Sequence, residues 1–448
     1  MTMSPDAQPR PSWFDGVAVY CKPRVLIVLL LGFSAGLPFS LTGQTLQAWM
    51  TETGVDIRTI GLFAAVGTPY WAKPLWAPAV DALDVPLLSR LLGRRRGWLM
   101  LTQILLFISI ILLAINDPAS SPWLVAGAAL LVTTASATQD IVIDAFRVES
   151  LPENEQAAGM ASYVAAYRIG MLISTAGALF LVSAIEASGF DKQSAWRWGY
   201  VAMAGLVVIG IITALVATEP ERSVEAEAAR AGEKPFARVV EAAVGAFKDF
   251  LGYELASVML AFVVLFKFTD ALSGAMTAPF VIDLGFTRNE YAAIVKGVGL
   301  AALLLGGFAG GFIARALPLA ASLWIGGILQ AVANLSFSAL ALVGTNTTML
   351  AAAIIAENFT SAIGTVMFVA YLSALCRNPL HTATQYALLT ALAAVGRTYL
   401  SSGAGFIAQS TGWAWFFVIC MLAGIPSLIL LAWLQRHGHF KRLEPKRS

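Results

Sequence analysis

Ionisable side chains inside long apolar stretches are the residues of this sequence most able to do chemistry. Each charge would cost about 2.5–3.5 kcal/mol at a lipid-facing helix centre, so nine of them would cost roughly 25–30 kcal/mol, several times the stability of a folded protein. They must therefore face a bundle interior, a cavity or one another. Five are basic and four acidic, which allows internal pairing and leaves one positive charge for an anionic solute. The nine are Lys73, Asp140, Asp144, Arg168, Lys267, Asp270, Lys296, Glu357 and Arg397.

Two groups of these charges have spacings that place them on one helix face. Lys267 and Asp270 are three residues apart, so their side chains are neighbours on a helix and can form an ion pair. Asp140, Asp144 and Arg147 follow one another at intervals of four and three residues and share a face. The second group is compatible with a proton-linked carboxylate network or with a salt-bridge lock that closes one mouth of a pathway.

Depth along the helices separates the roles that we expect of these charges. With a rise of about 1.5 Å per residue, Arg168, Lys267 and Glu357 fall near the middle of their spans. Asp144 and Arg147 lie nearer a helix end, where a lock would sit. No histidine lies in a predicted span core, so any transported proton must be carried by carboxylates. We expect proton or substrate binding at the deeper carboxylates, which are Asp140, Asp270 and Glu357.

Twelve apolar stretches must carry these residues through a bilayer. The 448-residue chain is 58% hydrophobic and 12% charged, with a mean hydropathy of +0.73. Soluble proteins carry roughly 25% charged residues, and one span needs about 20 apolar residues. The sequence therefore predicts an all-α, polytopic membrane protein. The predicted spans are 25–49, 58–80, 98–115, 123–146, 158–184, 198–217, 254–280, 291–313, 318–343, 348–375, 383–409 and 413–434.

One polar linker divides these spans into six and six. Its second part, Phe236–Leu251, has apolar residues at helical spacing and predicts an amphipathic helix, which lies on the inner membrane surface or packs on cytoplasmic loops. We expect a cytoplasmic N-terminal tail (1–24), an N-terminal six-helix bundle (25–217), a cytoplasmic linker (218–253), a C-terminal six-helix bundle (254–434) and a basic cytoplasmic tail (435–448).

The distribution of Lys and Arg predicts the orientation in the membrane. Twenty of these residues fall on the side of the two termini, and four fall on the opposite side. Because cytoplasmic loops are enriched in Lys and Arg, both termini are predicted to be cytoplasmic. The net charge of +2 gives no basis for nucleic-acid binding, and the three scattered cysteines predict neither a disulfide framework nor a metal site.

The second span carries the strongest local signal for an irregular, site-lining helix. Its stretch TPYWAKPLWAP (68–78) holds three prolines, which kink a helix and free backbone carbonyl groups. Such breaks are tolerated in lipid where neighbouring helices or a cavity satisfy those groups. Tyr70, Trp71 and Trp76 suit stacking on sugar faces, and aromatic packing or an interfacial position is the alternative, above all for Trp76.

Several segments in both halves resemble one transporter family. The fifth span, AAYRIGMLISTAGA around Arg168, also resembles the eleventh, AAVGRTYLSSGAGF around Arg397, which is typical of two parallel six-span repeats. The sequence resembles the anhydromuropeptide permease family of the major facilitator superfamily. The matching stretches are 36–50, 70–81, 93–103, 137–147, 167–174, 265–271, 356–376 and 383–399.

The resemblance implies proton-driven import of cell-wall turnover products across the bacterial inner membrane. The implied cargo is N-acetylglucosaminyl-1,6-anhydro-N-acetylmuramic acid, with or without its stem peptide. We expect a monomer without cofactor, metal, nucleic-acid partner or enzymatic activity. The rival interpretations are transport of another anionic solute, such as a nucleotide-linked acyl group or a siderophore, a membrane-embedded enzyme, and a non-transporting receptor.

The expected site residues follow from the resemblance together with the chemistry of the cargo. For substrate binding we expect Gln44, Gln47, Tyr70, Lys73, Gln139, Arg168, Lys267, Asn358 and Arg397. For proton coupling we expect Asp140, Asp270 and Glu357, and for gating Asp81, Arg94, Asp144 and Arg147. The interval from Asp81 to the Arg94–Arg96 run is longer than in the general superfamily loop motif, so the details of that gate do not carry over.

Overall fold

The computed structural model describes residues 18–55, 59, 63–221, 235–252, 254–286, 288–376, 378 and 380–443. Within these ranges every regular element is helical, and ten helices are long and apolar enough to cross a membrane. The predicted second and eleventh spans are built from shorter helical pieces and complete the set of twelve. The all-α, membrane-spanning architecture predicted from the sequence is therefore confirmed.

The first half of the chain supplies six spans. They are formed by α2 (Pro23–Ser40), η2 (Leu41–Thr45) and α3 (Leu46–Glu52); η3 (Phe63–Gly67), α5 (Thr68–Ala72), η4 (Lys73–Leu75) and α6 (Ala77–Ala82); α8 (Arg94–Ile115); α9 (Pro122–Ser150); α10 (Glu153–Leu172), η5 (Ile173–Gly177) and α11 (Ala178–Ala187); and α12 (Lys192–Val216). The short helices η1 (Val19–Cys21) and α7 (Leu88–Leu92) flank them.

The second half follows the linker helix α14 (Pro235–Leu251). Its spans are formed by α15 (Ala256–Leu265) and α16 (Phe268–Asp283); α17 (Arg288–Ile294), η6 (Val295–Gly299) and α18 (Leu300–Ala316); α19 (Leu319–Val343); α20 (Thr347–Leu375); α21 (Thr382–Leu400), η7 (Ser401–Gly403) and α22 (Ala404–Thr411); and α23 (Trp413–Leu422) with α24 (Ile425–Arg436). The helix α25 (His439–Leu443) ends the described chain.

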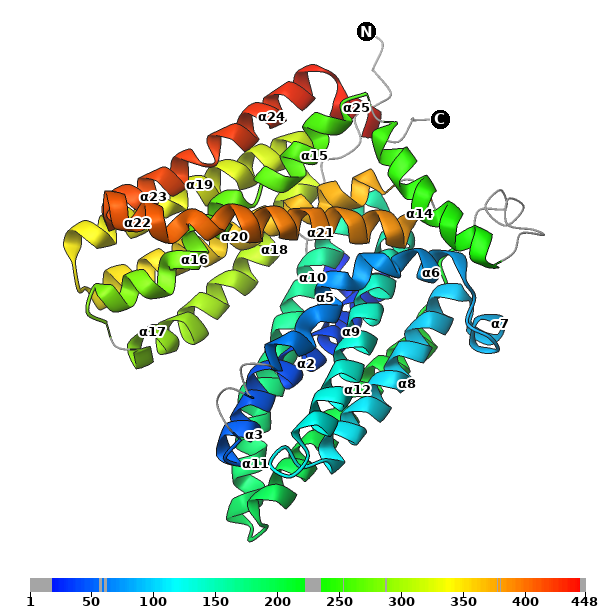
Figure 1. Ribbon diagram of the computed structural model, residues 1–448. Coiled ribbons are helices and arrows are strands. Elements are labelled where there is room, and N and C mark those ends of the chain that lie inside the picture. The colour runs from blue at the N-terminus through cyan, green and yellow to red at the C-terminus, as the bar shows by residue number, and fades with distance from the viewer. Residues whose placement is uncertain are drawn as a thin grey trace.

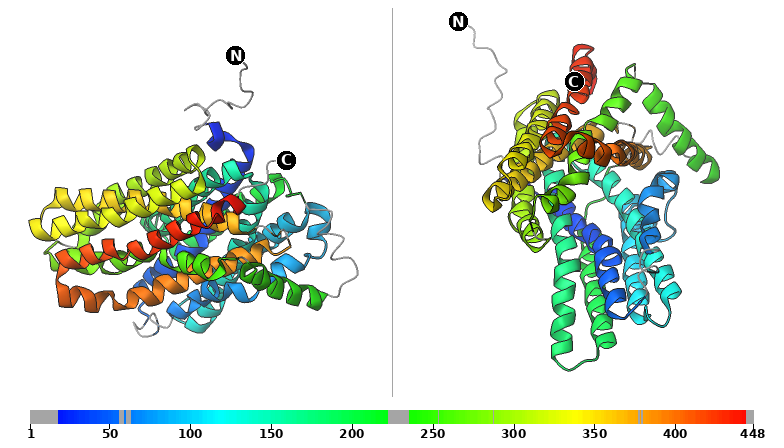
Figure 2. Two further views of the ribbon diagram at one scale, coloured as in Figure 1. Left: turned by 90° about the horizontal axis from the view of Figure 1, so that it is seen from above. Right: turned by 60° about the vertical axis from the view of Figure 1, so that its left-hand side comes forward.

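The two halves form two bundles that meet at one end and diverge at the other (Figure 1). We call the end with α6, α7, α14 and α25 the closed end, and the end with α3, α11 and α17 the open end. Near the closed end α10 packs on α18 and α20, while α21 packs on α6 and α9. The right-hand view of Figure 2 shows the same divergence of the bundles.

Close packing within each bundle requires glycine at particular helix crossings. A Cβ atom at Gly36 of α2 would lie 2.1 Å from the Tyr167 carbonyl oxygen of α10, and one at Gly306 of α18 would lie 2.2 Å from the Phe359 carbonyl oxygen of α20. These distances leave no room for a side chain. Gly32 and Gly310, each four residues from one of these glycines, also lie against the neighbouring backbone, so both pairs serve helix packing, as expected in membrane proteins.

The prolines break the second span as predicted. Three residues, Lys73–Leu75, form a single 3₁₀ turn between α5 and α6, with Pro74 in that turn. Proline lacks an N–H group and its ring clashes with the preceding turn of an α-helix, so the chain cannot continue regularly through it. As a consequence, Lys73 lies at a helix break in the interior of the first bundle.

Candidate functional site

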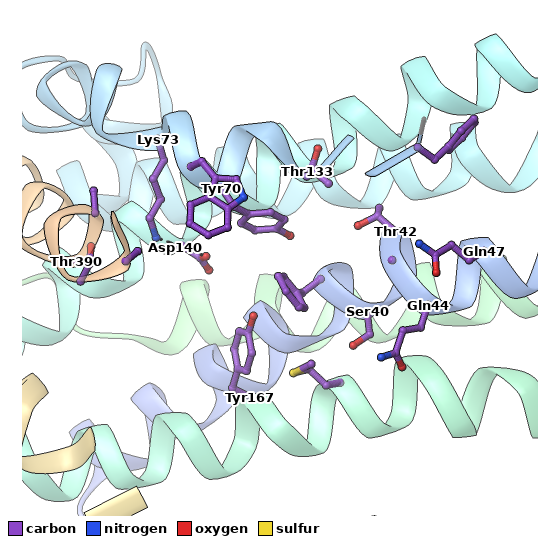
Figure 3. Close-up of a pocket in the computed structure, with 18 residues that line it drawn as sticks. Ser40, Thr42, Gln44, Gln47, Tyr70, Lys73, Thr133, Asp140, Tyr167 and Thr390 are labelled. Carbon is purple, nitrogen blue, oxygen red and sulfur yellow. Dashed lines mark ion pairs between the residues drawn. The ribbon is translucent and has the colours of Figure 1, made fainter. Parts of the chain in front are cut away.

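A cavity of about 800 Å³ opens among the helices of the first bundle and is completed by α21 from the second. Figure 3 shows its lining side chains, which extend from Lys73 and Asp140 at one end to Gln44 and Gln47 at the other. Its volume lies in the range of small-molecule sites, which is roughly 300–1,000 Å³. The lining residues are Phe39, Ser40, Thr42, Gly43, Gln44, Gln47, Phe63, Gly67, Tyr70, Trp71, Lys73, Thr133, Asp140, Tyr167, Met171, Thr390, Ala391 and Ala394.

An ion pair between two helices marks the deep end of this cavity. The Lys73 Nζ atom lies 3.8 Å from Asp140 Oδ2, and the two side chains are 16% and 14% exposed. Asp140 Oδ1 is buried and has no hydrogen-bond partner among the described residues. The pair is long for a charge-assisted hydrogen bond, which is about 2.7–2.9 Å. Both charges therefore retain capacity to bind a ligand or a proton.

Aromatic rings and amides form the rest of the cavity wall. The Tyr70 hydroxyl donates to Ser136 Oγ at 2.9 Å, and the Tyr70 ring lies 5.3 Å from that of Phe39, centroid to centroid. The Tyr167 ring lies 6.4 Å from Phe39 on the other side. Gln44 and Gln47 are exposed at the far end of the cavity, where the π-helical turn η2 widens the first span. Such turns occur frequently at functional sites.

A second ion pair lies in the other bundle, outside the cavity lining. Lys267 sits at the break between α15 and α16 and pairs with Asp270, as its spacing predicts. The Lys267 ammonium also lies 3.3 Å from Gln330 Oε1 and 3.3 Å from the Ser361 carbonyl oxygen. The Ser361 hydroxyl donates to Asp270 Oδ2 at 2.5 Å. This pair is therefore held by three helices and is more completely satisfied than the first.

The structure separates two expected substrate-binding residues, Gln139 and Asn358, and the expected coupling residue Glu357 from the cavity. Gln139 is fully buried and donates to Ser34 Oγ at 3.2 Å inside the first bundle. The Asn358 amide donates to the Ile354 carbonyl oxygen of its own helix at 2.9 Å. Glu357 is partly buried on the same helix, α20. None of these three lines the cavity.

Of the two arginines of the internal repeat, Arg168 and Arg397, the structure describes the side chain of Arg168 only. The side chain of Arg397 lies outside the described residues, as does that of Lys296. Arg168 is exposed, and its helix face is shared with Ala157 and Ala161, which pack against Val366 of the second bundle. Because the bundles diverge beyond this contact, Arg168 is directed toward the opening between them.

A network at the closed end joins the bundles through Asp81. The Asp81 carboxylate accepts hydrogen bonds from the backbone N–H groups of Ala383 at 3.1 Å and Thr384 at 2.7 Å, and from the Thr384 hydroxyl at 2.8 Å. It thereby caps the first turn of α21, where an anion is favoured by the helix dipole. Arg95 donates to Asp81 Oδ1 at 2.8 Å and to Glu149 at 2.5 Å, with all three side chains buried or nearly so.

The arginine that binds the Asp81 carboxylate is therefore Arg95, a residue that sequence reasoning did not single out. Arg94 donates instead to the Asp81 carbonyl oxygen at 2.8 Å and lies 3.6 Å from Glu149. Three consecutive arginines gave no means of choosing among them, because the choice depends on how α8 is rotated about its axis.

Arg147 also connects the bundles, but not through Asp144. Its Nη1 atom donates to Gln156 at 3.0 Å and to Ser373 Oγ of α20 at 3.1 Å, and its guanidinium lies 5.2 Å from the centre of the Tyr386 ring. Asp144 is partly buried one turn away on α9. Arg147 thus contacts two helices of the second bundle directly.

The first span contains a serine flanked by glycines. Residues 32–36, Gly-Phe-Ser-Ala-Gly, match the G-x-S-x-G pattern of hydrolase nucleophiles. Ser34 is fully buried in the middle of α2 and exchanges hydrogen bonds with Gln103 at 2.9–3.0 Å. The pattern requires an exposed serine on a strand-to-helix turn, so here it is a helix-packing sequence.

Comparison with protein families and curated proteins gives concordant results. The model of the Major Facilitator Superfamily matches residues 28–397. The chain is 39% identical to the anhydromuropeptide permease of Escherichia coli K12 over 415 residues, which are 92% of this chain and 80% of that protein. It is 33% identical to a transporter named AmpG 4 from Rickettsia felis, covering 92% and 97% of the two chains.

Solved structures of sugar symporters share the fold. The proton:xylose symporter XylE superposes with a TM-score of 0.65 at 12% identity, covering 92% of this chain and 94% of that one. The transporter FucP in its outward conformation gives 0.65 at 13% identity, covering 93% and 99%. At these identities the likeness concerns the arrangement of helices alone.

Proposed function

Because this chain belongs to the anhydromuropeptide permease family of the major facilitator superfamily, we propose that it imports anhydromuropeptides across the bacterial inner membrane together with protons. The cargo is N-acetylglucosaminyl-1,6-anhydro-N-acetylmuramic acid, with or without its stem peptide. The observation that carries the proposal is 39% identity over 92% of the chain to a permease of that name.

The Lys73–Asp140 pair supports a mechanism in which cargo and proton compete for one contact. A carboxylate of the cargo binds Lys73 and displaces Asp140, which is then free to take up a proton. Conversely, a proton on Asp140 removes its attraction for Lys73 and leaves the lysine available to the cargo. The 3.8 Å separation of the two groups supports this exchange, because the bond to be broken is weak.

The cavity wall offers contacts that suit a disaccharide. Tyr70 and Tyr167 present aromatic rings to sugar faces, and Gln44 and Gln47 present amides to hydroxyl and acetamido groups. An amide both donates and accepts hydrogen bonds, which matches the mixed donors and acceptors of the cargo. Arg168, and Arg397 at the equivalent position of the internal repeat, bind peptide carboxylates of longer cargo in this proposal.

The closed end serves as the cytoplasmic gate in this proposal, and both termini are cytoplasmic. The excess of Lys and Arg at that end supports the orientation. Asp81, Arg94, Arg95 and Arg147 hold the gate shut while the open end admits cargo from the periplasm. In the second bundle Asp270 and Glu357 assist proton coupling in this proposal, and Lys267 is the ion-pair partner of Asp270.

Reconstituted uptake tests the proposal directly. Purified protein in proteoliposomes is given radiolabelled anhydromuropeptide, with and without an inward proton gradient. We expect accumulation that requires the gradient and that falls in Asp140→Asn. Accumulation of a nucleotide-linked acyl group or a siderophore, but not of the muropeptide, would instead identify another anionic solute as cargo. Binding without flux would identify a receptor.

A further inference from the structure

The linker helix α14 has two apolar faces, of which only one packs on the protein. On the inner face Ala242, Ala246 and Phe250 are buried, with exposed fractions of 4% or less. This face lies so close to α21 that a Cβ atom at Gly245 would come within 2.3 Å of His381 Cε1. The sequence left open whether this helix packs on loops or lies on the membrane, and the structure confirms the packing for this face.

A polar contact fixes the rotation of α14 about its own axis. Asp249 Oδ2 accepts hydrogen bonds from Asn378 Nδ2 at 3.0 Å and from Gln385 Nε2 at 2.8 Å, and it lies 3.0 Å from His381 Nδ1. All three partners lie at or just before the first turns of α21. The outer face of α14 therefore has a set direction rather than a range of directions.

The outer face is a continuous apolar stripe along the whole helix. Its members recur at intervals of four, four, three and four residues, which places them on one side of an α-helix. Each is between 44% and 80% exposed. They are Phe236, Val240, Val244, Phe247 and Leu251. Exposed apolar surface of this extent marks a binding surface.

The position of α14 next to a membrane-spanning helix indicates that lipid covers the stripe. Only four residues separate the end of α14 from Ala256, the first residue of a membrane-spanning helix, so the chain between them spans at most roughly 18 Å. Figure 2 shows α14 at the periphery of the closed end rather than over its centre. The polar side chains Glu241 and Lys248 lie beside the stripe and are exposed. An apolar face flanked by charged residues at this level suits the boundary between lipid headgroups and acyl chains.

We propose that α14 is a membrane-surface helix whose outer stripe inserts into the phospholipid leaflet at the closed end while its inner face holds the start of α21. The bilayer surface is thereby connected, through Asp249, to the same helix that Asp81 caps. The proposal goes beyond transport of a particular cargo and does not depend on which solute is carried.

Lipid-borne quenchers test the proposal in the full-length protein. Cys21, the exposed native cysteine, is replaced by serine, and the buried Cys376 and Cys420 remain. Single cysteines carrying an environment-sensitive fluorophore are introduced in neighbouring pairs. Each pair has one position on the stripe and one on the polar flank, so each stripe label has a matched control. The pairs are Val240→Cys with Glu241→Cys and Phe247→Cys with Lys248→Cys.

In vesicles that contain doxyl-labelled phosphatidylcholine, we expect quenching at least about twofold stronger for each stripe label than for its neighbour. Aqueous iodide should show the opposite order. Equal quenching within both pairs would overturn the proposal. Shielding of the stripe labels from both quenchers that grows with the protein-to-lipid ratio would also overturn it, because a second copy of the chain would then cover the stripe.

Discussion

The two bundles each place a lysine at a helix break and pair it with an aspartate, but the two pairs differ in how firmly they are held. Lys73 and Asp140 come from different spans, lie 3.8 Å apart and face a cavity. Lys267 and Asp270 share one span and are joined by Ser361 and Gln330. The two pairs are about equally buried, so the extra hydrogen bonds distinguish the firm pair, and the longer pair beside a cavity is more available for binding. We infer that the pair in the first bundle binds ligands and that the pair in the second bundle mainly holds its helices together.

The largest effect should come from breaking the firm pair. Replacement of Lys267 by alanine removes the counter-ion of Asp270 in the second bundle. Removal of one partner of a buried ion pair costs about 3–5 kcal/mol, so we expect a marked loss of folding stability. Thermal unfolding in detergent measures it, and Lys267→Arg is the matched control. An unchanged melting temperature in Lys267→Ala would show that this pair does not stabilise the fold.

The loose pair should affect transport more than stability. In Lys73→Ala we expect the uptake rate to fall about 100-fold, which corresponds to roughly 2.7 kcal/mol of lost cargo and transition-state binding. The melting temperature should fall less than in Lys267→Ala, because fewer hydrogen bonds are lost with the lysine. Uptake and thermal unfolding are measured on the same preparation. If stability falls as far as in Lys267→Ala, the contrast between the two bundles is wrong.

A third charged contact, at the closed end, joins the two bundles to each other and is fully buried. Asp81→Asn weakens hydrogen bonds to a charged group, each worth roughly 1.5–3 kcal/mol, so it should shift the protein toward the state in which this end is open. Cys376, which is buried and lines a second cavity at this end, then reacts faster with a water-soluble maleimide in the Cys21→Ser background. Glu221→Gln, an exposed charge at the same end, is the control. Equal labelling of Cys376 in the two variants would contradict the role of Asp81 in holding the closed end shut.

The smallest effect should come from single amides. Gln44 lines the cavity, whereas the Asn358 amide is engaged by its own helix. One neutral hydrogen bond contributes about 0.5–1.5 kcal/mol, so Gln44→Ala should raise the apparent KM about threefold to tenfold. Asn358→Ala should leave KM nearly unchanged. A larger increase in KM for Asn358→Ala than for Gln44→Ala would indicate that the cargo binds in the second bundle.

The sequence predicted what depends on local spacing and missed what depends on packing between spans. The twelve spans, the proline-broken second span, the linker helix and the Lys267–Asp270 pair follow from composition or from helical intervals, and the structure contains them. The pairing of Lys73 with Asp140 joins residues 67 positions apart, and no interval within one helix indicates it.

Rotation of helices about their axes was also beyond the sequence. Gln139 and Asp140 are adjacent, yet one is directed into the bundle and the other into the cavity. Arg94 and Arg95 differ in the same way at the closed end. In a helix that is polar at several successive positions, only the packing of neighbouring spans decides which side chain meets which partner.

The contact between Asp81 and α21 has an evolutionary consequence. Two of its three hydrogen bonds come from main-chain N–H groups, which every residue except proline provides. The hydrogen bond from position 383 therefore does not depend on the side chain there, which is restricted only by packing, whereas the contact does depend on the side chain at position 81. If the carboxylate at position 81 is lost, a substitution in α21 does not compensate, because the donors in α21 are main-chain N–H groups and still need an acceptor from position 81. Sequence covariation between these two segments should accordingly be weak, although they touch.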